Sequence, residues 1–186
     1  MNIFLMLLLC GQLVNIFLEA NMKYLDFRDN IISGDLLSWT HHGWNSWYNF
    51  QIQMVRAFTQ SEYSHVGIAW VTGGRVFVLE AVVPYVRIYP LSMCESFYYI
   101  GMHKELSKEA EEFALLQIGE EYSKRMCFKA FFNMVKEGDS GKWQCAKYAN
   151  EVLRANGIDY GINFTPTSLV QAALEDGKDL MYIETK

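Results

Sequence analysis

His65 and Glu80 are the two side chains whose positions first suggest chemistry. His65 begins an apolar segment, and Glu80 follows the apolar run 76–79. The Gly73-Gly74 pair between them is typical of a two-residue hairpin turn. Because a strand advances about 3.3 Å per residue, we expect both side chains near the open end of one hairpin, within hydrogen-bonding reach. A histidine oriented by a carboxylate is the base of a nucleophilic triad.

Cys145 is the candidate nucleophile. It opens a predicted helix over 143–155, whose apolar stripe at helical spacing includes Tyr148, Ala149 and Val152. The stripe predicts that the face carrying Cys145 packs inward. A thiol in the first turn of a helix meets the positive end of the helix dipole and unpaired backbone N–H groups. These groups favour a thiolate and can bind an oxyanion, which is the geometry that a cysteine hydrolase needs.

Each of these residues also has an ordinary structural interpretation. Cys145 can be a small core residue, His65 a hydrogen-bonded strand histidine, and Glu80 a charge at the end of a strand. The sequence around each residue leaves both interpretations open.

Other residues that could carry chemistry have weaker settings. His41 and His42 are adjacent, so their side chains point apart, and no acidic or cysteine partner stands at ligand spacing. We therefore predict no metal site. The cysteines at 10, 94 and 127 lack the setting of Cys145, and four cysteines in 186 residues do not make a disulfide framework.

The predicted elements are mostly strands first and helices after, which is the order of an α+β domain. Ser107 and Thr165 are predicted helix N-caps, with Pro166 at the first helical position and Ile118 on the inner face of the helix after Ser107. No linker or repeat divides residues 22–186, so we predict one domain with a small antiparallel sheet packed against helices. Strands are expected at 34–39, 64–71, 76–79, 86–89 and 97–100, and further helices at 44–58 and 122–136.

Composition and charge exclude several classes of protein. Hydrophobic residues make up 51% of the 186 residues and charged residues 20%, which excludes intrinsic disorder. The formal net charge is −5 at pH 7, and a general nucleic-acid binder usually shows a basic field. We therefore expect no nucleic-acid partner.

Residues 1–21 form an apolar leader with three interpretations that remain open. It can be a secretory signal or membrane anchor, although no Lys or Arg precedes Lys23 and the apolar run is interrupted at Gln12 and Asn15. Translation can instead start at Met22, or the leader can be a helix packed on the domain. The localisation stays undecided: cell envelope or virion if the leader is real, and cytoplasm if translation starts at Met22.

Several short segments, taken together and in this order, resemble a known family. They are Gly34-Asp35-Leu36-Leu37, the run Ser-Glu-Tyr-Ser-His-Val-Gly-Ile at 61–68, Leu79-Glu80-Ala81, Trp143-Gln144-Cys145-Ala146, and Thr165-Pro166. Over about residues 32–175 the sequence resembles the circularly permuted branch of the NlpC-type papain-like cysteine hydrolases, in particular its YiiX-like group, which is frequent in bacteria and tailed phages. The lecithin retinol acyltransferase group is a more distant relation.

This resemblance implies a permuted papain-like fold in which the cysteine helix follows the histidine strand. It implies that Cys145 is the nucleophile, His65 the base and Glu80 the group that orients His65, with no metal or organic cofactor. The family often has Ser-Glu after its cysteine, whereas Ala146-Lys147 stand here, so no role is assigned to those two positions.

The expected function is hydrolysis of an amide or ester bond through a thioester. The expected substrate is a peptide, a peptidoglycan peptide or an acyl lipid. The alternative is a non-catalytic structural or binding protein that keeps the papain-like fold, such as a phage virion component or an envelope-attached module. Residues 1–21 would then attach it to a membrane or a virion.

Overall fold

The centre of the fold is one mixed sheet. The structure is a computed structural model, and it describes residues 22–40, 63–122, 143–162 and 165–185. Within these ranges the sheet has seven strands in the order β1-β7-β6-β2-β3-β4-β5. Neighbouring strands are antiparallel, except that β1 and β7 run parallel. The strands are β1 (Met22–Lys23), β2 (Leu36–Trp39), β3 (His65–Thr72), β4 (Arg75–Ala81), β5 (Val86–Pro90), β6 (Phe97–Ile100) and β7 (Leu180–Glu184).

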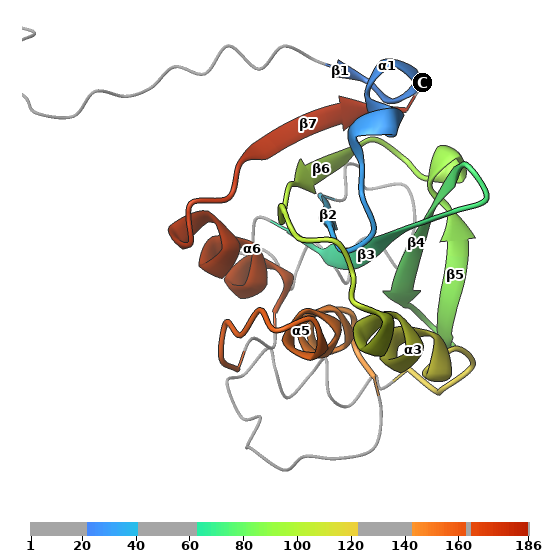
Figure 1. Cartoon of the computed structure of the whole chain (residues 1–186), viewed down its shortest axis with the longest axis vertical. Helices are drawn as coiled ribbons and strands as arrows, with labels where there is room; N and C mark the ends of the chain where they lie inside the picture. Colours follow the sequence, from blue (N-terminus) through green and yellow to red (C-terminus); the bar gives the residue numbers. More distant parts are fainter. Residues whose placement is uncertain (1–21, 41–62, 123–142, 163–164, 186) are drawn as a thin grey trace, which may run out of the picture.

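Three helices of the second half of the chain lie together beside this sheet (Figure 1). They are α3 (Lys108–Leu116), α5 (Cys145–Ala155) and α6 (Pro166–Glu175). A one-turn helix, α1 (Tyr24–Phe27), lies near β7 at the other end of the molecule, and the short 3-10 turns η2 (Arg28–Asn30) and η3 (Leu91–Met93) complete the described elements. The mixed α+β class that the element order predicts is confirmed.

The helix starts follow the capping residues that the sequence predicts. The Ser107 hydroxyl accepts a hydrogen bond from the backbone N–H of Ala110, and Thr165 forms a reciprocal capping box with Ser168 ahead of Pro166. The predicted start of α5 is wrong by two residues. Trp143 forms a bridge with Tyr122 instead, and α5 begins at Cys145. Ile118 lies beyond the end of α3 and is 37% exposed, so it is not an inner-face residue of that helix.

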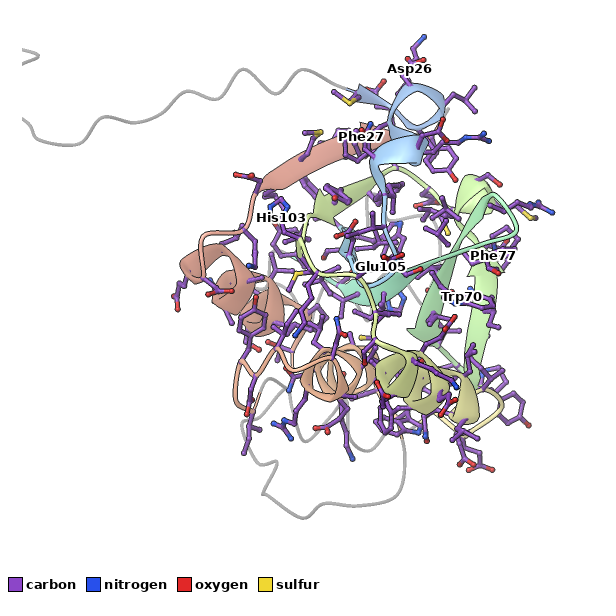
Figure 2. The ribbon with its side chains drawn as sticks, viewed as in Figure 1. Asp26, Phe27, Trp70, Phe77, His103 and Glu105 are labelled. Carbon is purple, nitrogen blue, oxygen red and sulfur yellow. The ribbon has the colours of Figure 1, made fainter. Side chains whose placement is uncertain are left out.

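The β3–β4 hairpin forms as the Gly73-Gly74 pair predicts. Gly73 and Gly74 have φ values of +57° and +72°, the conformation that a two-residue turn between twisted strands needs. Thr72 pairs with Arg75 at the turn, and Trp70 pairs with Phe77, with ring centroids 5.9 Å apart (Figure 2). This register fixes which residues meet at the open end of the hairpin.

The two faces of the sheet carry separate apolar clusters. On one face, Val66, Ile68, Leu79 and Ala81 pack with residues of α3, α5 and α6. On the other face, Leu37, Ala69, Val78 and Phe97 pack with Tyr24, Phe27 and Ile31. Because successive residues of a strand alternate between faces, these two clusters determine on which face of the sheet each side chain of β3 and β4 lies.

The sheet is larger than the small antiparallel sheet that we predicted, and it is not purely antiparallel. Strand β7 follows α6, which breaks the order of strands first and helices after. It was missed because residues 180–183 are a short apolar run without alternation at the end of the chain. Strand β1 has two residues and forms only by pairing with β7.

Several predictions fall on residues outside those that the structure describes. They are the apolar leader 1–21, the helix at 44–58, nearly all of the helix at 122–136, the pair His41 and His42, and the cysteines Cys10 and Cys127. Attachment to a membrane or virion through residues 1–21 therefore stays a prediction. No helix among the described residues is long and apolar enough to cross a bilayer.

A buried carboxylate ties the start of β2 to the segment after β6. Asp35 is fully buried and accepts hydrogen bonds from the backbone N–H of Ile32 and of Met102 and from the Tyr99 hydroxyl, each 2.9 Å long. The polar donors around it would have no other acceptor in this apolar setting. Asp35 therefore fixes the position of the central strand β2 within the sheet.

We expect Asp35→Ala to lower the free energy of unfolding by about 3 kcal/mol, because the substitution leaves without a partner the buried donors that now bond a charged acceptor. Urea unfolding measures this change. Asp26→Ala is the matched control, since Asp26 is an exposed acid on α1 that points away from the fold (Figure 2), and it should change stability by less than about 0.5 kcal/mol. A loss below about 1 kcal/mol for Asp35→Ala would contradict the anchoring role.

Candidate active site

The structure brings His65 and Glu80 into direct contact. Nε2 of His65 lies 2.6 Å from Oε2 of Glu80, and the two side chains are 17% and 5% exposed. His65 is the first residue of β3, and Glu80 is the last residue but one of β4. The predicted contact at the open end of the hairpin is therefore present.

Gly67 makes room for this contact. The ladder between β3 and β4 pairs Ile68 with Leu79, and its continuation places Glu80 opposite Gly67, two residues along the strand from His65. A Cβ at Gly67 would lie 2.5 Å from Cγ2 of Val78 and 3.3 Å from Cβ of Glu80. The diagonal contact between Glu80 and His65 therefore passes over a position where only hydrogen fits.

Arg87 holds the other oxygen of the same carboxylate. Its Nε and Nη2 lie 2.8 Å and 2.7 Å from Oε1 of Glu80. Arg87 is the register partner of Glu80 in the β4–β5 ladder, so the sheet itself sets this pair. The guanidinium also lies over the ring of Tyr89, with Cζ 4.5 Å from the ring centroid.

Cys145 reaches this group from the start of α5. It lines one cleft with His65 and Glu80, and its interaction with the imidazole raises the pKa of His65. Because Nε2 of His65 is bonded to Glu80, Nδ1 is the nitrogen left for the thiol. Cys145 is 5% exposed and belongs to the apolar cluster on the helix side of the sheet. The thiol and the imidazole therefore meet at the open end of the hairpin, where α5 begins.

Gln144 caps α5 directly before the thiol. Its side-chain oxygen accepts a hydrogen bond of 3.1 Å from the backbone N–H of Ala146 and lies 3.8 Å from Sγ of Cys145. Gln144 is only 2% exposed. The cap fixes the first turn of α5 and with it the position of the Cys145 side chain.

The charges of these groups reinforce one another. Burial lowers the pKa of His65, but hydrogen bonds and charge interactions with Cys145 and Glu80 outweigh it and raise the pKa from 6.5 to about 10. Burial raises the pKa of Glu80, but its hydrogen bonds and charge interactions with His65 and Arg87 outweigh burial and keep that pKa below 4.5. At neutral pH the pair is an imidazolium and a carboxylate.

A cleft of about 290 Å³ opens beside the three candidate residues. Its walls are formed by β2, by the ends of β3 and β4, by β5 and by the segment after η3. The ring of Trp39 lies 5.4 Å from that of His65, between centroids, and its indole N–H donates to the backbone oxygen of Glu95. The lining residues include Trp39, His65, Glu80, Val82, Val83, Arg87, Tyr89, Cys94, Glu95, Tyr122 and Cys145.

Sequence reasoning missed Arg87 and Gln144 as parts of this site. The alternation of polar and apolar residues in Val86-Arg87-Ile88-Tyr89 indicates a strand that contains Arg87. The register of Arg87 against Glu80, however, depends on the loop between the two strands. Gln144 is not among the residues that most favour an N-cap. Cys94 lines the same cleft as Cys145, and burial raises its pKa to about 12.

The two pKa shifts predict how stability changes with pH. The Glu80 contribution is present above about 4.5 and is lost as the pH falls through the lowered pKa. The His65 contribution is present below about 6.5 and is lost as the pH rises toward 10. We therefore expect the difference in unfolding free energy between the natural chain and His65→Gln to be largest between pH 4.5 and 6.5 and to shrink toward pH 10. Urea unfolding across this range measures it, and a difference that does not vary with pH would contradict the charged pair.

The comparisons with known proteins give one informative result. No protein-family model and no curated protein matches the chain. Among solved structures, the chain is similar to the protein described as metalloprotein YiiX from Escherichia coli O157:H7, with a TM-score of 0.51 and 20% sequence identity. The match covers 78% of this chain and 81% of that one. At this identity the likeness concerns the fold alone, and the chain has a YiiX-like fold.

Proposed function

We propose that this protein is a cysteine hydrolase that cleaves an amide or ester bond through a thioester, with a permuted papain-like arrangement of its site. One observation carries the proposal: the His65 ring is bonded to Glu80, and Cys145, at the start of a helix, lines the same cleft as this pair. This is the relation of nucleophile, base and orienting group that acyl transfer needs.

In the first half of the reaction, Cys145 attacks the substrate carbonyl. His65, whose raised pKa makes it an imidazolium, already holds on Nδ1 the proton that the thiol gives up, and the sulfur forms a bond to the carbonyl carbon. The imidazolium then gives the proton to the leaving amine or alcohol as the carbon–heteroatom bond breaks, which leaves a thioester. Glu80 stays ionised throughout and holds Nε2–H, so that Nδ1 faces the thiol.

In the second half, water replaces the leaving group. His65 takes a proton from water, and the hydroxide adds to the thioester carbon. The C–S bond then breaks, the carboxylic acid leaves, and His65 keeps the proton beside the sulfur, as at the start of the cycle. No redox partner or cofactor is needed for either half.

The oxyanion of each tetrahedral intermediate needs donors near the thiol. The first N–H groups of a helix have no partner within the helix, but the N–H of Ala146 is committed to Gln144. We therefore propose the backbone N–H of Cys145 as the oxyanion donor of this turn.

A metal ion does not fit this site, although the similar structure YiiX is described as a metalloprotein. A cation would compete for Glu80, whose Oε1 faces two guanidinium nitrogens and whose Oε2 faces His65. The guanidinium repels a cation at that position. Among the described residues, no group of three His, Cys, Asp or Glu side chains could hold a metal ion. The mechanism therefore has no metal step.

The cleft supports a substrate with an uncharged acyl segment. Val82 and Val83 line it together with the rings of Trp39 and Tyr122. Peptides, peptidoglycan peptides and acyl lipids all present such a segment beside a carbonyl, and they remain the substrate classes of the proposal.

Substitution of the three residues should give a fixed order of activity. Cys145→Ala should abolish hydrolysis of an activated ester, because no thioester can form, and should change the free energy of unfolding by about 1 kcal/mol. His65→Ala should also abolish turnover. Glu80→Gln keeps a hydrogen-bonding group but loses the charge, so we expect a loss on the order of 10²–10⁴-fold. Retained activity in Cys145→Ala would show that the chemistry is not thiol-based.

Thiol labelling tests the proposal without a substrate and separates it from a non-catalytic binding protein. Iodoacetamide near pH 7 should alkylate Cys145 at least about tenfold faster than Cys94, because Cys145 shares its cleft with the proposed base His65 and burial raises the pKa of Cys94. Cys94 is the internal control, since it lines the same cleft and burial raises its pKa. Mass spectrometry of digested samples measures both rates. Equal and slow labelling of the two thiols would favour the binding protein.

A further inference from the structure

We propose that Arg87 is a positioning residue of this site: its guanidinium fixes the plane of the Glu80 carboxylate, so that Oε2 alone faces Nε2 of His65. The catalytic consequence of this inference rests on the proposed function. The positioning itself rests on the geometry of three neighbouring strands, β3, β4 and β5.

The sheet places Arg87 where it can act on Glu80 and on little else. The two residues are register partners, and both of their side chains lie on the face opposite α5. Nε and Nη2 both bond Oε1, at 2.8 Å and 2.7 Å, and these two charge-assisted bonds hold that oxygen, so that the two ends of the carboxylate together define its plane. Oε2 is then left for His65 at 2.6 Å.

The guanidinium is itself held in place, although the Arg87 side chain is 48% exposed. The ring of Tyr89, two residues along β5, lies on its face at 4.5 Å from Cζ. An ordinary exposed ion pair has freely moving partners and contributes little. Here one partner is 5% exposed and the other is packed on a ring, so the pair has one geometry.

Arg87 also balances the charges of the site. The Glu80 carboxylate faces the imidazolium of His65 with one oxygen and the guanidinium of Arg87 with the other. Without Arg87, a buried carboxylate would have one charged partner instead of two, and Glu80 could turn away from His65 or take up a proton. Glu95 and Cys94 also line the cleft from the segment after η3, and neither brings a positive charge.

Three variants test the role. Arg87→Met removes the charge and both hydrogen bonds, whereas Arg87→Lys keeps the charge and loses the paired contact. Arg75→Met is the matched control, because Arg75 is also an arginine over an aromatic ring of the same sheet, with Cζ 5.7 Å from the Phe77 centroid, at the far end of the hairpin.

The first readout is the downfield proton resonance of His65 Nε2–H, which is protected from exchange by its bond to Glu80. We expect the resonance in the natural chain and in Arg75→Met, its loss in Arg87→Met, and partial recovery in Arg87→Lys. The second readout is Cys145 alkylation, which should slow on the order of tenfold in Arg87→Met, about threefold in Arg87→Lys, and less than about twofold in Arg75→Met.

A resonance that persists unchanged in Arg87→Met would overturn the positioning role. If Arg87→Met does not fold, as far-ultraviolet circular dichroism would reveal, Arg87→Lys decides: an unchanged resonance and an unchanged rate would overturn the inference. If Cys145 of the natural chain is as slow as Cys94 while the resonance still depends on Arg87, the positioning role stands and the proposed hydrolase function fails.

Discussion

The burial of one carboxylate governs the arrangement of this site. Glu80 is 5% exposed, and an ionised carboxylate in such a place is costly unless both of its oxygens are paired. The pairing needs a cation from each neighbouring strand, which β3 supplies as His65 and β5 supplies as Arg87. Pairing both oxygens of Glu80 requires the register of three strands, the glycine at the contact with His65 and the positive charge of His65.

Much of the fold could be predicted because its signals are local. The Gly73-Gly74 turn, the Ser107 cap and the Thr165-Pro166 start each act within a few residues, and all three appear as expected. The contact of His65 with Glu80 could be predicted for the same reason, since a two-residue turn fixes the register of both strands. The geometry of a short hairpin with a two-residue turn is therefore set by its own residues.

The parts that could not be predicted depend on contacts between distant segments. Strand β7 is a short apolar run without alternation, and it forms by pairing with β6 and β1. Arg87 acquires a role only when the loop between β4 and β5 fixes its register. Helix α5 begins at Cys145 and not at Trp143, because Trp143 forms a β-bridge with Tyr122. The helical periodicity of the sequence does not indicate this pairing.

The parallel pairing of β1 with β7 places Met22 beside Ile183. The first and last described strands of the domain are thus neighbours at one edge of the sheet, far from the cleft in the strand order. A short link between them would turn the chain into a nearly closed ring, and a ring can be opened at another exposed turn without moving the core. The place at which such a ring is opened would set the order of the thiol and the imidazole along the chain without changing how the two groups lie in space.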